Sequence, residues 1–162
     1  MDALGALCPP VFEGAAPMKA DPERVARLSA EILERLEKLA VYTSSALTDF
    51  QSDERTVLAA KMLLVEAVEG AAALYNHILA RVFREAPGGF ILCFEALAVR
   101  LGWEEEFRHR LRRLARFRNE LIHEYREITP DQVYQIARQE ADALREMVRR
   151  VREWLQAKTD EG

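Results

Sequence analysis

The stretch DERTVLAAKMLLVEAVEGAAALYNHILARV, residues 53–82, decides the fold class of this chain. Apolar residues recur along it at steps of three and four, the spacing that puts them on one face of an α-helix. The stripe consists of Leu58, Met62, Val65, Val68, Ala72, Tyr75, Leu79 and Val82. Ser52 and Asp53 supply a helix start, and Pro87 with the two glycines after it supplies a stop. The segment therefore predicts one long amphipathic helix.

The segments around this helix also have helical periodicity. Upstream, Asp21 followed by Pro22 is a cap with proline at the first helical position. The apolar stripe behind it predicts a single long helix to about residue 50, with Thr43 as its polar interruption. Downstream, we expect a short helix at about 92–101, closed by Gly102, and a long one at about 103–125.

A capping box starts the last predicted helix, with Thr129 as the cap and Gln132 three residues later. The apolar stripe that follows continues to about residue 158, and Glu140 interrupts it. No segment alternates apolar and polar residues as a half-buried strand does. We therefore predict an all-α fold, an antiparallel bundle of four main helices plus one short helix.

Length and composition indicate one globular domain. The chain has 162 residues, 49% of them hydrophobic and 31% charged. Residues 1–20 are expected to be a flexible leader, with the helical domain at 21–158. The leader lacks the pattern of a signal peptide, and no apolar run is long enough for a membrane span. Cys8 and Cys93 show no metal-ligand spacing, so reduced thiols in a cytoplasmic protein are expected.

Positive charge is concentrated in one place although the formal net charge is −4. Six arginines occur within eleven residues: Arg108, Arg110, Arg112, Arg113, Arg116 and Arg118. Such a run can be a solvated helix face, or it can be a local patch for an anionic partner. Because this run leads into the segment described next, we expect Arg112 and Arg116 to contact RNA phosphates.

The segment FRNELIHEYREI, residues 117–128, carries the groups with the most chemistry. On a helix, Asn119 and His123 share a face, and Arg118 and Tyr125 share a neighbouring one. Cleavage of RNA needs proton transfer at the 2′-hydroxyl and at the leaving oxygen, and positive charge at the phosphorus. Histidine can transfer protons near neutral pH, and arginine can grip two phosphate oxygens. This chemistry requires no metal ion.

A single histidine is one group short of an acid–base pair. A symmetric dimer would supply two arginine–histidine sets across one groove, provided that the helices at 103–125 pack near the two-fold axis.

The words RNELIHEY resemble the signature of the HEPN superfamily, an arginine followed after four to six residues by a histidine, and in detail its HepT-like toxin branch. The resemblance implies an RNA-cleaving toxin in which Arg118 and His123 are catalytic and Asn119 assists. It also implies a homodimer, no cofactor, and a partner nucleotidyltransferase of the MNT type that adenylylates Tyr125. Where the branch often has an arginine and an aspartate in its second helix, this chain is expected to have Met62 and Ala73.

Two other functions remain open. The pairs formed by Glu106 with His109 and by Glu120 with His123 have the spacing of di-iron ligands in helical bundles. However, a dinuclear centre would require a break in the helix between them, because about 14 residues of helix span about 21 Å. Alternatively, the same arginine and histidine could bind phosphate without cutting, in a substrate-binding subunit or adaptor of a nucleotidyltransferase.

Overall fold

The computed structural model describes residues 19–160, and within this range it contains helices and no strands, which confirms the all-α prediction. The helices are α1 (Pro22–Tyr42), α2 (Leu47–Ser52), α3 (Glu54–Ile78), α4 (Phe90–Arg100), α5 (Glu105–His123), α6 (Pro130–Gln139) and α7 (Asp142–Asp160), with a π-helical turn, η1 (Leu79–Phe83), directly after α3.

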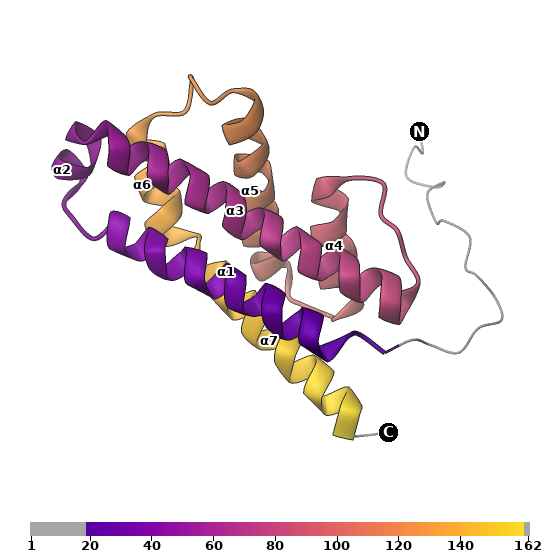
Figure 1. Cartoon of the computed structure of the whole chain (residues 1–162). Helices are drawn as coiled ribbons and strands as arrows, with labels where there is room; N and C mark the ends of the chain where they lie inside the picture. Colours follow the sequence, from indigo (N-terminus) through magenta and orange to yellow (C-terminus); the bar gives the residue numbers. More distant parts are fainter. Residues whose placement is uncertain (1–18, 161–162) are drawn as a thin grey trace, which may run out of the picture.

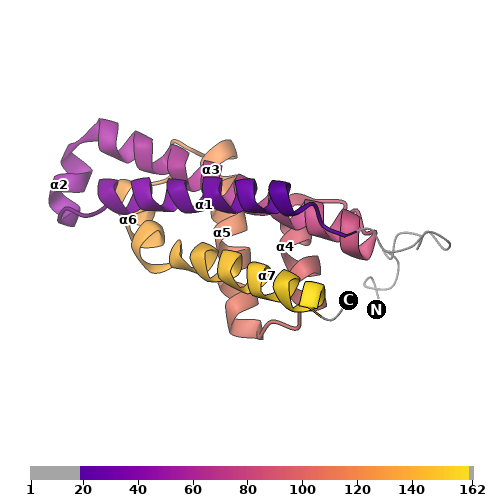
Figure 2. The same cartoon turned by 60° about the horizontal axis from the view of Figure 1, so that its bottom comes forward.

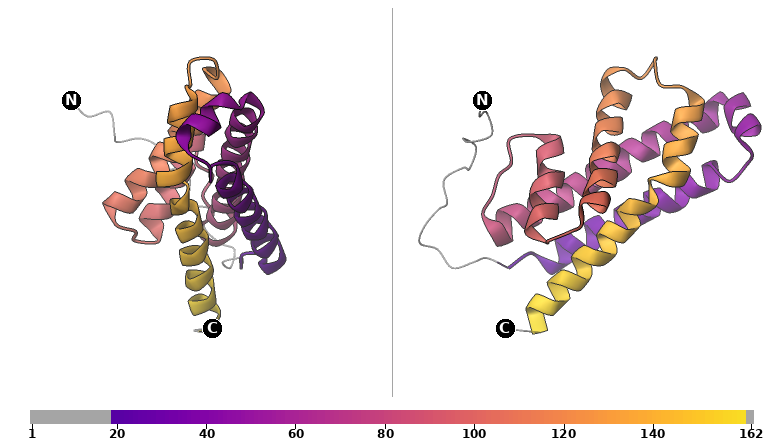
Figure 3. Two further views of the ribbon diagram at one scale, coloured as in Figure 1. Left: turned by 90° about the vertical axis from the view of Figure 1, so that its left-hand side faces the viewer. Right: turned by 180° about the vertical axis from the view of Figure 1, so that it is seen from behind.

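The helices α1 and α3 form a long antiparallel pair, and α4 to α7 cover one side of it (Figure 1, Figure 3). The helix α7 runs alongside α1, while α4 and α5 pack against α3 (Figure 2). Gly70 allows α1 and α3 to approach closely, because a Cβ atom there would lie 2.9 Å from Cγ1 of Ile32. The buried core follows this contact and continues under α4 and α5.

The predicted helix at residues 21–50 is wrong in its length, because the chain turns after α1 and starts again as α2. At the break, the Thr43 hydroxyl donates to the Leu39 carbonyl at 2.9 Å, and Arg138 donates to the Thr43 carbonyl at 2.7 Å. Turning the chain here buries Phe50 against Tyr134 of α6, with ring centroids 5.3 Å apart.

The predicted last helix is also divided, between α6 and α7, at the residue that interrupted the apolar stripe. Glu140 is buried there, and its carboxylate accepts hydrogen bonds from Arg110 at 3.1 Å and Arg113 at 2.6 Å. A buried carboxylate needs such partners, because an unpaired charge away from water is costly. The capping box of Thr129 and Gln132 is confirmed as the start of α6.

The central helix α3 starts at the predicted cap, Asp53, but its predicted stripe is partly wrong. Leu58 and Met62 are 56% and 57% exposed, whereas the core-facing side of α3 contains Ala60, Leu64, Ala67, Val68, Ala71, Leu74, Tyr75 and Ile78. The apolar residues of α3 are too many for one face. Packing against α1, α4 and α5 buries most of them and leaves these two in solvent.

The predicted leader at 1–20 lies outside the described residues, except for Lys19 and Ala20, and Ala20 packs against the core. The prediction for Cys8 also falls outside this range, whereas Cys93 is a free, buried cysteine. Burial raises the pKa of the Cys93 thiol to about 11. Within the described residues, no helix is both long and apolar enough to span a bilayer.

Candidate active site

Arg118, in the last two turns of α5, lies against α3 and α4. Its guanidinium carbon is 4.3 Å from the ring centroid of Phe90, at the start of α4. One terminal nitrogen donates to the side-chain oxygen of Asn119 at 3.0 Å, and the other pairs with the carboxylate of Glu69 on α3. The Arg118 side chain keeps 18% of its surface exposed. An arginine held by a ring and two polar partners is a fixed positive charge at the surface.

His123 is the last residue of α5, one turn beyond Asn119, and it is exposed. Within residues 19–160, no side chain or backbone group hydrogen-bonds to its imidazole. It lies five residues after Arg118, so the two Cα atoms are separated by about 7.5 Å along the helix axis. The imidazole is therefore exposed, and within the described residues no hydrogen bond competes for its ring nitrogens.

Tyr125 lies beyond the end of α5, so the prediction that it shares a helical face with Arg118 is wrong. The Glu124 amide still donates to the Glu120 carbonyl, at 2.7 Å, but the chain then leaves the helix. The ammonium group of Lys61 on α3 explains this change of direction, because it donates to the carbonyls of Tyr125 and Ile128, both at 3.1 Å. The Tyr125 side chain is 54% exposed.

The arginine run on α5 is mostly engaged in ion pairs. Arg112 pairs with Glu105 and Glu95, and these two bonds raise the pKa of its guanidinium. Arg108 shares the same two carboxylates, while Arg110 and Arg113 hold Glu140. By contrast, Arg116 is exposed and has no ion pair with any residue between 19 and 160. Among the arginines of the run that precede Arg118, Arg116 is thus the one whose charge is available to a ligand.

Two of the residues that shape this site were missed by sequence reasoning, namely Lys61 and Glu69. The resemblance singled out Met62 and Ala73 on this helix only as places where an arginine and an aspartate are replaced by uncharged residues. Lys61 and Glu69 stand eight residues apart, about 12 Å along α3, and reach the two ends of the motif. The sequence gives only a weak indication of these two residues, which is that they are charged while most other positions of the helix are apolar.

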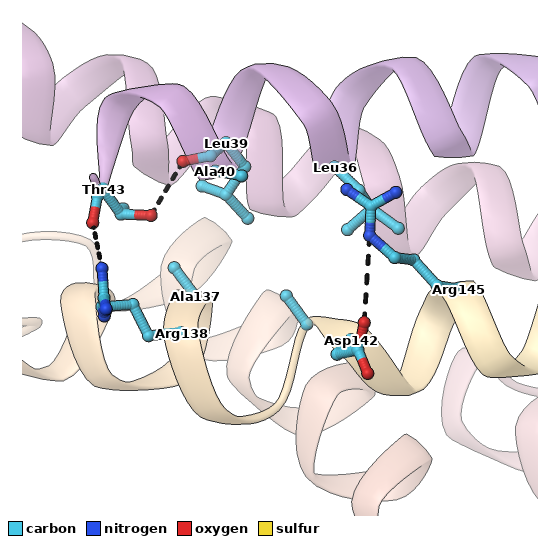
Figure 4. Close-up of a pocket in the computed structure, with 9 residues that line it drawn as sticks. Leu36, Leu39, Ala40, Thr43, Ala137, Arg138, Asp142 and Arg145 are labelled. Carbon is cyan, nitrogen blue, oxygen red and sulfur yellow. Dashed lines mark hydrogen bonds and ion pairs between the residues drawn. The ribbon is translucent and has the colours of Figure 1, made fainter.

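Two cavities of the described surface lie away from Arg118 and His123. One of about 250 Å³ lies between α1 and the α6–α7 junction, where Arg138 and Thr43 already bond to the backbone (Figure 4). Another, of about 660 Å³, is lined by residues of α1, α3 and η1 that include Arg24 and His77. Neither contains Arg118 or His123.

The di-iron alternative does not fit this geometry. Glu106, His109, Glu120 and His123 all lie on the uninterrupted helix α5, so the two pairs stay about 21 Å apart. A dinuclear centre places its metals about 3.5–4 Å apart. Among residues 19–160, no three histidine, cysteine or acidic side chains gather in a way that could hold a metal ion.

Comparison with known proteins agrees with the motif. A family model described as "Ribonuclease HepT-like" matches residues 32–151. No curated protein matches the chain. Among solved structures, the cytosolic protein of unknown function YutE from Bacillus subtilis superposes with a TM-score of 0.73 at 18% identity, covering 87% of this chain and 94% of that one. The crystal structure of a toxin–antitoxin with AMP-PNP also gives 0.73, at 15% identity, covering 81% and 98%. At such identities these two structures establish a shared fold.

Proposed function

The chain belongs to the HepT-like ribonuclease family, and from that premise we propose that it is an endoribonuclease toxin that cuts tRNA or another cytoplasmic RNA without a metal ion. The observation that carries the proposal is the pairing on α5 of a fixed guanidinium, Arg118, with an accessible imidazole, His123. We further propose that a nucleotidyltransferase antitoxin of the MNT type neutralises it by adenylylating Tyr125.

Each residue has a role that follows from its chemistry. Arg118 would bind the non-bridging oxygens of the scissile phosphate and stabilise the charge that builds up on them. His123 would transfer a proton, either from the attacking 2′-hydroxyl or to the leaving 5′-oxygen. Asn119 accepts a hydrogen bond from Arg118 and would keep the guanidinium turned toward the phosphate.

A homodimer would complete the site, since one histidine cannot be both the acid and the base in a single step. Several large apolar side chains near the motif are exposed, which is typical of an interface. Leu58 and Met62 flank Lys61 in the sequence of α3, and Ile122, which is 44% exposed, precedes His123 on α5. Packing these residues against a second copy would bring two sets of Arg118 and His123 to one groove.

Adenylylation of Tyr125 would silence such a site by charge and bulk. The side chain is accessible and stands two residues after His123. An added nucleotide would carry a negative phosphate into the path of the RNA backbone. A structural neighbour that is a toxin–antitoxin solved with AMP-PNP, an ATP analogue, agrees with a partner that uses a nucleoside triphosphate.

The test is cleavage of total tRNA in the presence of EDTA by purified protein that mass spectrometry shows to be unmodified. Wild-type protein should cut, and His123→Ala should not. The matched control is His109→Ala, because His109 is an exposed histidine on the same helix and lies outside the motif. Binding of RNA without any cutting by the wild type would instead support a substrate-binding subunit of a nucleotidyltransferase. Loss of cutting in EDTA would contradict the metal-free mechanism.

A further inference from the structure

The segment that follows α5 has its backbone held in place, while the side chains of residues 124–127 are exposed. Lys61 binds the carbonyls of Tyr125 and Ile128, the Glu127 amide donates to the Glu124 carbonyl at 2.9 Å, and the Ile128 side chain is buried. These contacts lie on both sides of Arg126, so the backbone that carries Tyr125 and Arg126 is fixed at both ends.

Tyr125 and Arg126 form a pair on this segment. The Nε of Arg126 donates to the phenolic oxygen of Tyr125 at 3.1 Å, and the guanidinium carbon lies 5.7 Å from the ring centroid. The two terminal nitrogens of Arg126 bond to no other residue within 19–160. Arg126 is also the one lysine or arginine between residues 119 and 137. The Arg126 guanidinium is therefore the one basic side chain of this segment that lies next to the Tyr125 phenol.

Within residues 19–160, the other tyrosines have different environments, although Arg138 also lies over the ring of Tyr134, at 5.3 Å from its centroid. Tyr75 is fully buried, and the Tyr134 hydroxyl donates to the Ser45 carbonyl at 2.8 Å. Tyr42 is 42% exposed, similar to the 54% of Tyr125, but no residue described in the structure hydrogen-bonds to its hydroxyl. All four tyrosines thus differ, and among the bonds made by described residues only Tyr125 has a cation donating to its oxygen.

We propose that Arg126 makes Tyr125 the reactive phenol of this chain and binds the phosphate of the incoming nucleotide. The inference rests on the proposed function for its biological setting. In the transfer, the Tyr125 oxygen attacks the α-phosphorus of a nucleoside triphosphate and forms a new O–P bond. The bond from that phosphorus to the oxygen bridging toward the β-phosphate breaks, and pyrophosphate leaves. The phenolic proton passes to a base of the transferase or to solvent.

Arg126 contributes at two points of this reaction. Its Nε holds the phenolic oxygen, and a charge-assisted bond to that oxygen stabilises the negative charge present as the proton leaves. Its free terminal nitrogens can bind the oxygens of the α-phosphate, where charge builds up in the transition state. Without Arg126, the neighbouring carboxylates of Glu124 and Glu127 would repel the triphosphate.

The first experiment needs no partner and compares two tyrosines in one molecule. Phenylmethanesulfonyl fluoride sulfonylates phenolic oxygens with loss of fluoride and a proton, and peptide mass spectrometry measures the rate at Tyr125 and at Tyr42. In wild-type protein the Tyr125 rate should exceed the Tyr42 rate by about fivefold, the size expected of a charge-assisted bond weakened by solvent. Arg126→Gln should bring the ratio close to one, and Arg126→Lys should leave it between. Equal rates in the wild type, or an unchanged ratio in Arg126→Gln, would overturn the proposal.

The second experiment uses a purified nucleotidyltransferase of the MNT type and ATP labelled at the α-phosphate. Wild-type protein should be labelled on Tyr125, and Arg126→Gln about 100-fold more slowly, in line with the loss of one transition-state contact. Equal labelling of the two proteins would overturn the role of Arg126. If the wild type is labelled elsewhere or not at all, the proposed modification of Tyr125 is wrong, and the sulfonylation rates still decide what Arg126 does. Thermal unfolding should change little in Arg126→Gln, because the side chain is exposed.

Discussion

Replacing Arg118 with lysine tests whether the site needs a guanidinium or only a positive charge. Lysine keeps the charge but cannot lie flat on Phe90 while reaching both Glu69 and Asn119. Loss of one preorganised donor to a developing oxyanion typically lowers kcat by about 10²–10³. We therefore expect Arg118→Lys to cut RNA at least about 100-fold more slowly than the wild type.

The magnitude of the stability change shows that unfolding cannot explain such a loss. The Arg118–Phe90 contact is partly exposed, so it is worth about 1 kcal/mol. The Glu69 ion pair, with a half-exposed carboxylate, adds about 0–1 kcal/mol. A domain with a free energy of unfolding of at least about 5 kcal/mol would stay roughly 99% folded after losing both.

The assay is the initial rate of tRNA cleavage in EDTA, measured at a temperature well below the melting point of each variant. Arg113→Lys is the control, because Arg113 lies on the same helix but pairs with Glu140 instead. Cleavage by Arg118→Lys within about threefold of the wild type would refute the reasoning, since a planar donor would then be unnecessary.

Three further predictions follow from other contacts. Glu140→Gln should lower the free energy of unfolding by about 1–2 kcal/mol, and the melting temperature by about 2–8 °C. The amide keeps one oxygen that can accept from Arg110 or Arg113, but it loses the second acceptor and the negative charge that pairs with both arginines. The exposed pair of Arg149 and Glu153 provides the control, as Glu153→Gln should cost under about 0.5 kcal/mol. Arg116→Ala should reduce the slope of log affinity for RNA against log salt concentration by about 0.7. Arg112→Ala should leave this slope unchanged and lower the stability of the fold, because Arg112 is held by Glu95 and Glu105. Equal changes of slope in both variants would contradict this distinction. Finally, two carboxyl groups have a pKa lowered from 4.5 to about 2 by hydrogen bonds from arginines. Arg150 bonds to Glu104, and Arg149, with a smaller effect from Arg150, bonds to Glu146. Such groups stabilise the folded state above pH 4.5 and lose this contribution as pH falls toward 2. Chemical denaturation should therefore show that the free energy of unfolding falls less steeply between pH 4.5 and 2 for Arg150→Gln than for the wild type.

The sequence by itself determined the features that depend on neighbours along the chain. The caps at Asp21, Asp53 and Thr129 start helices where predicted, because a cap satisfies amide groups two or three residues away. The all-α class follows from helical periodicity in the same way. The spacing of Arg118 and His123 is likewise local, and both lie on one helix as expected.

The tertiary structure alone decided which charges are available and where the helices break. Arg112 and Arg116 look alike in the sequence, yet one is held by two carboxylates and the other faces solvent. The course of the chain after His123 depends on Lys61, more than sixty residues earlier. Such partners are chosen by the packing of whole helices, and that packing depends on contacts that no local pattern encodes. This is why the sequence predicted the motif, while the fold determined how its groups are held.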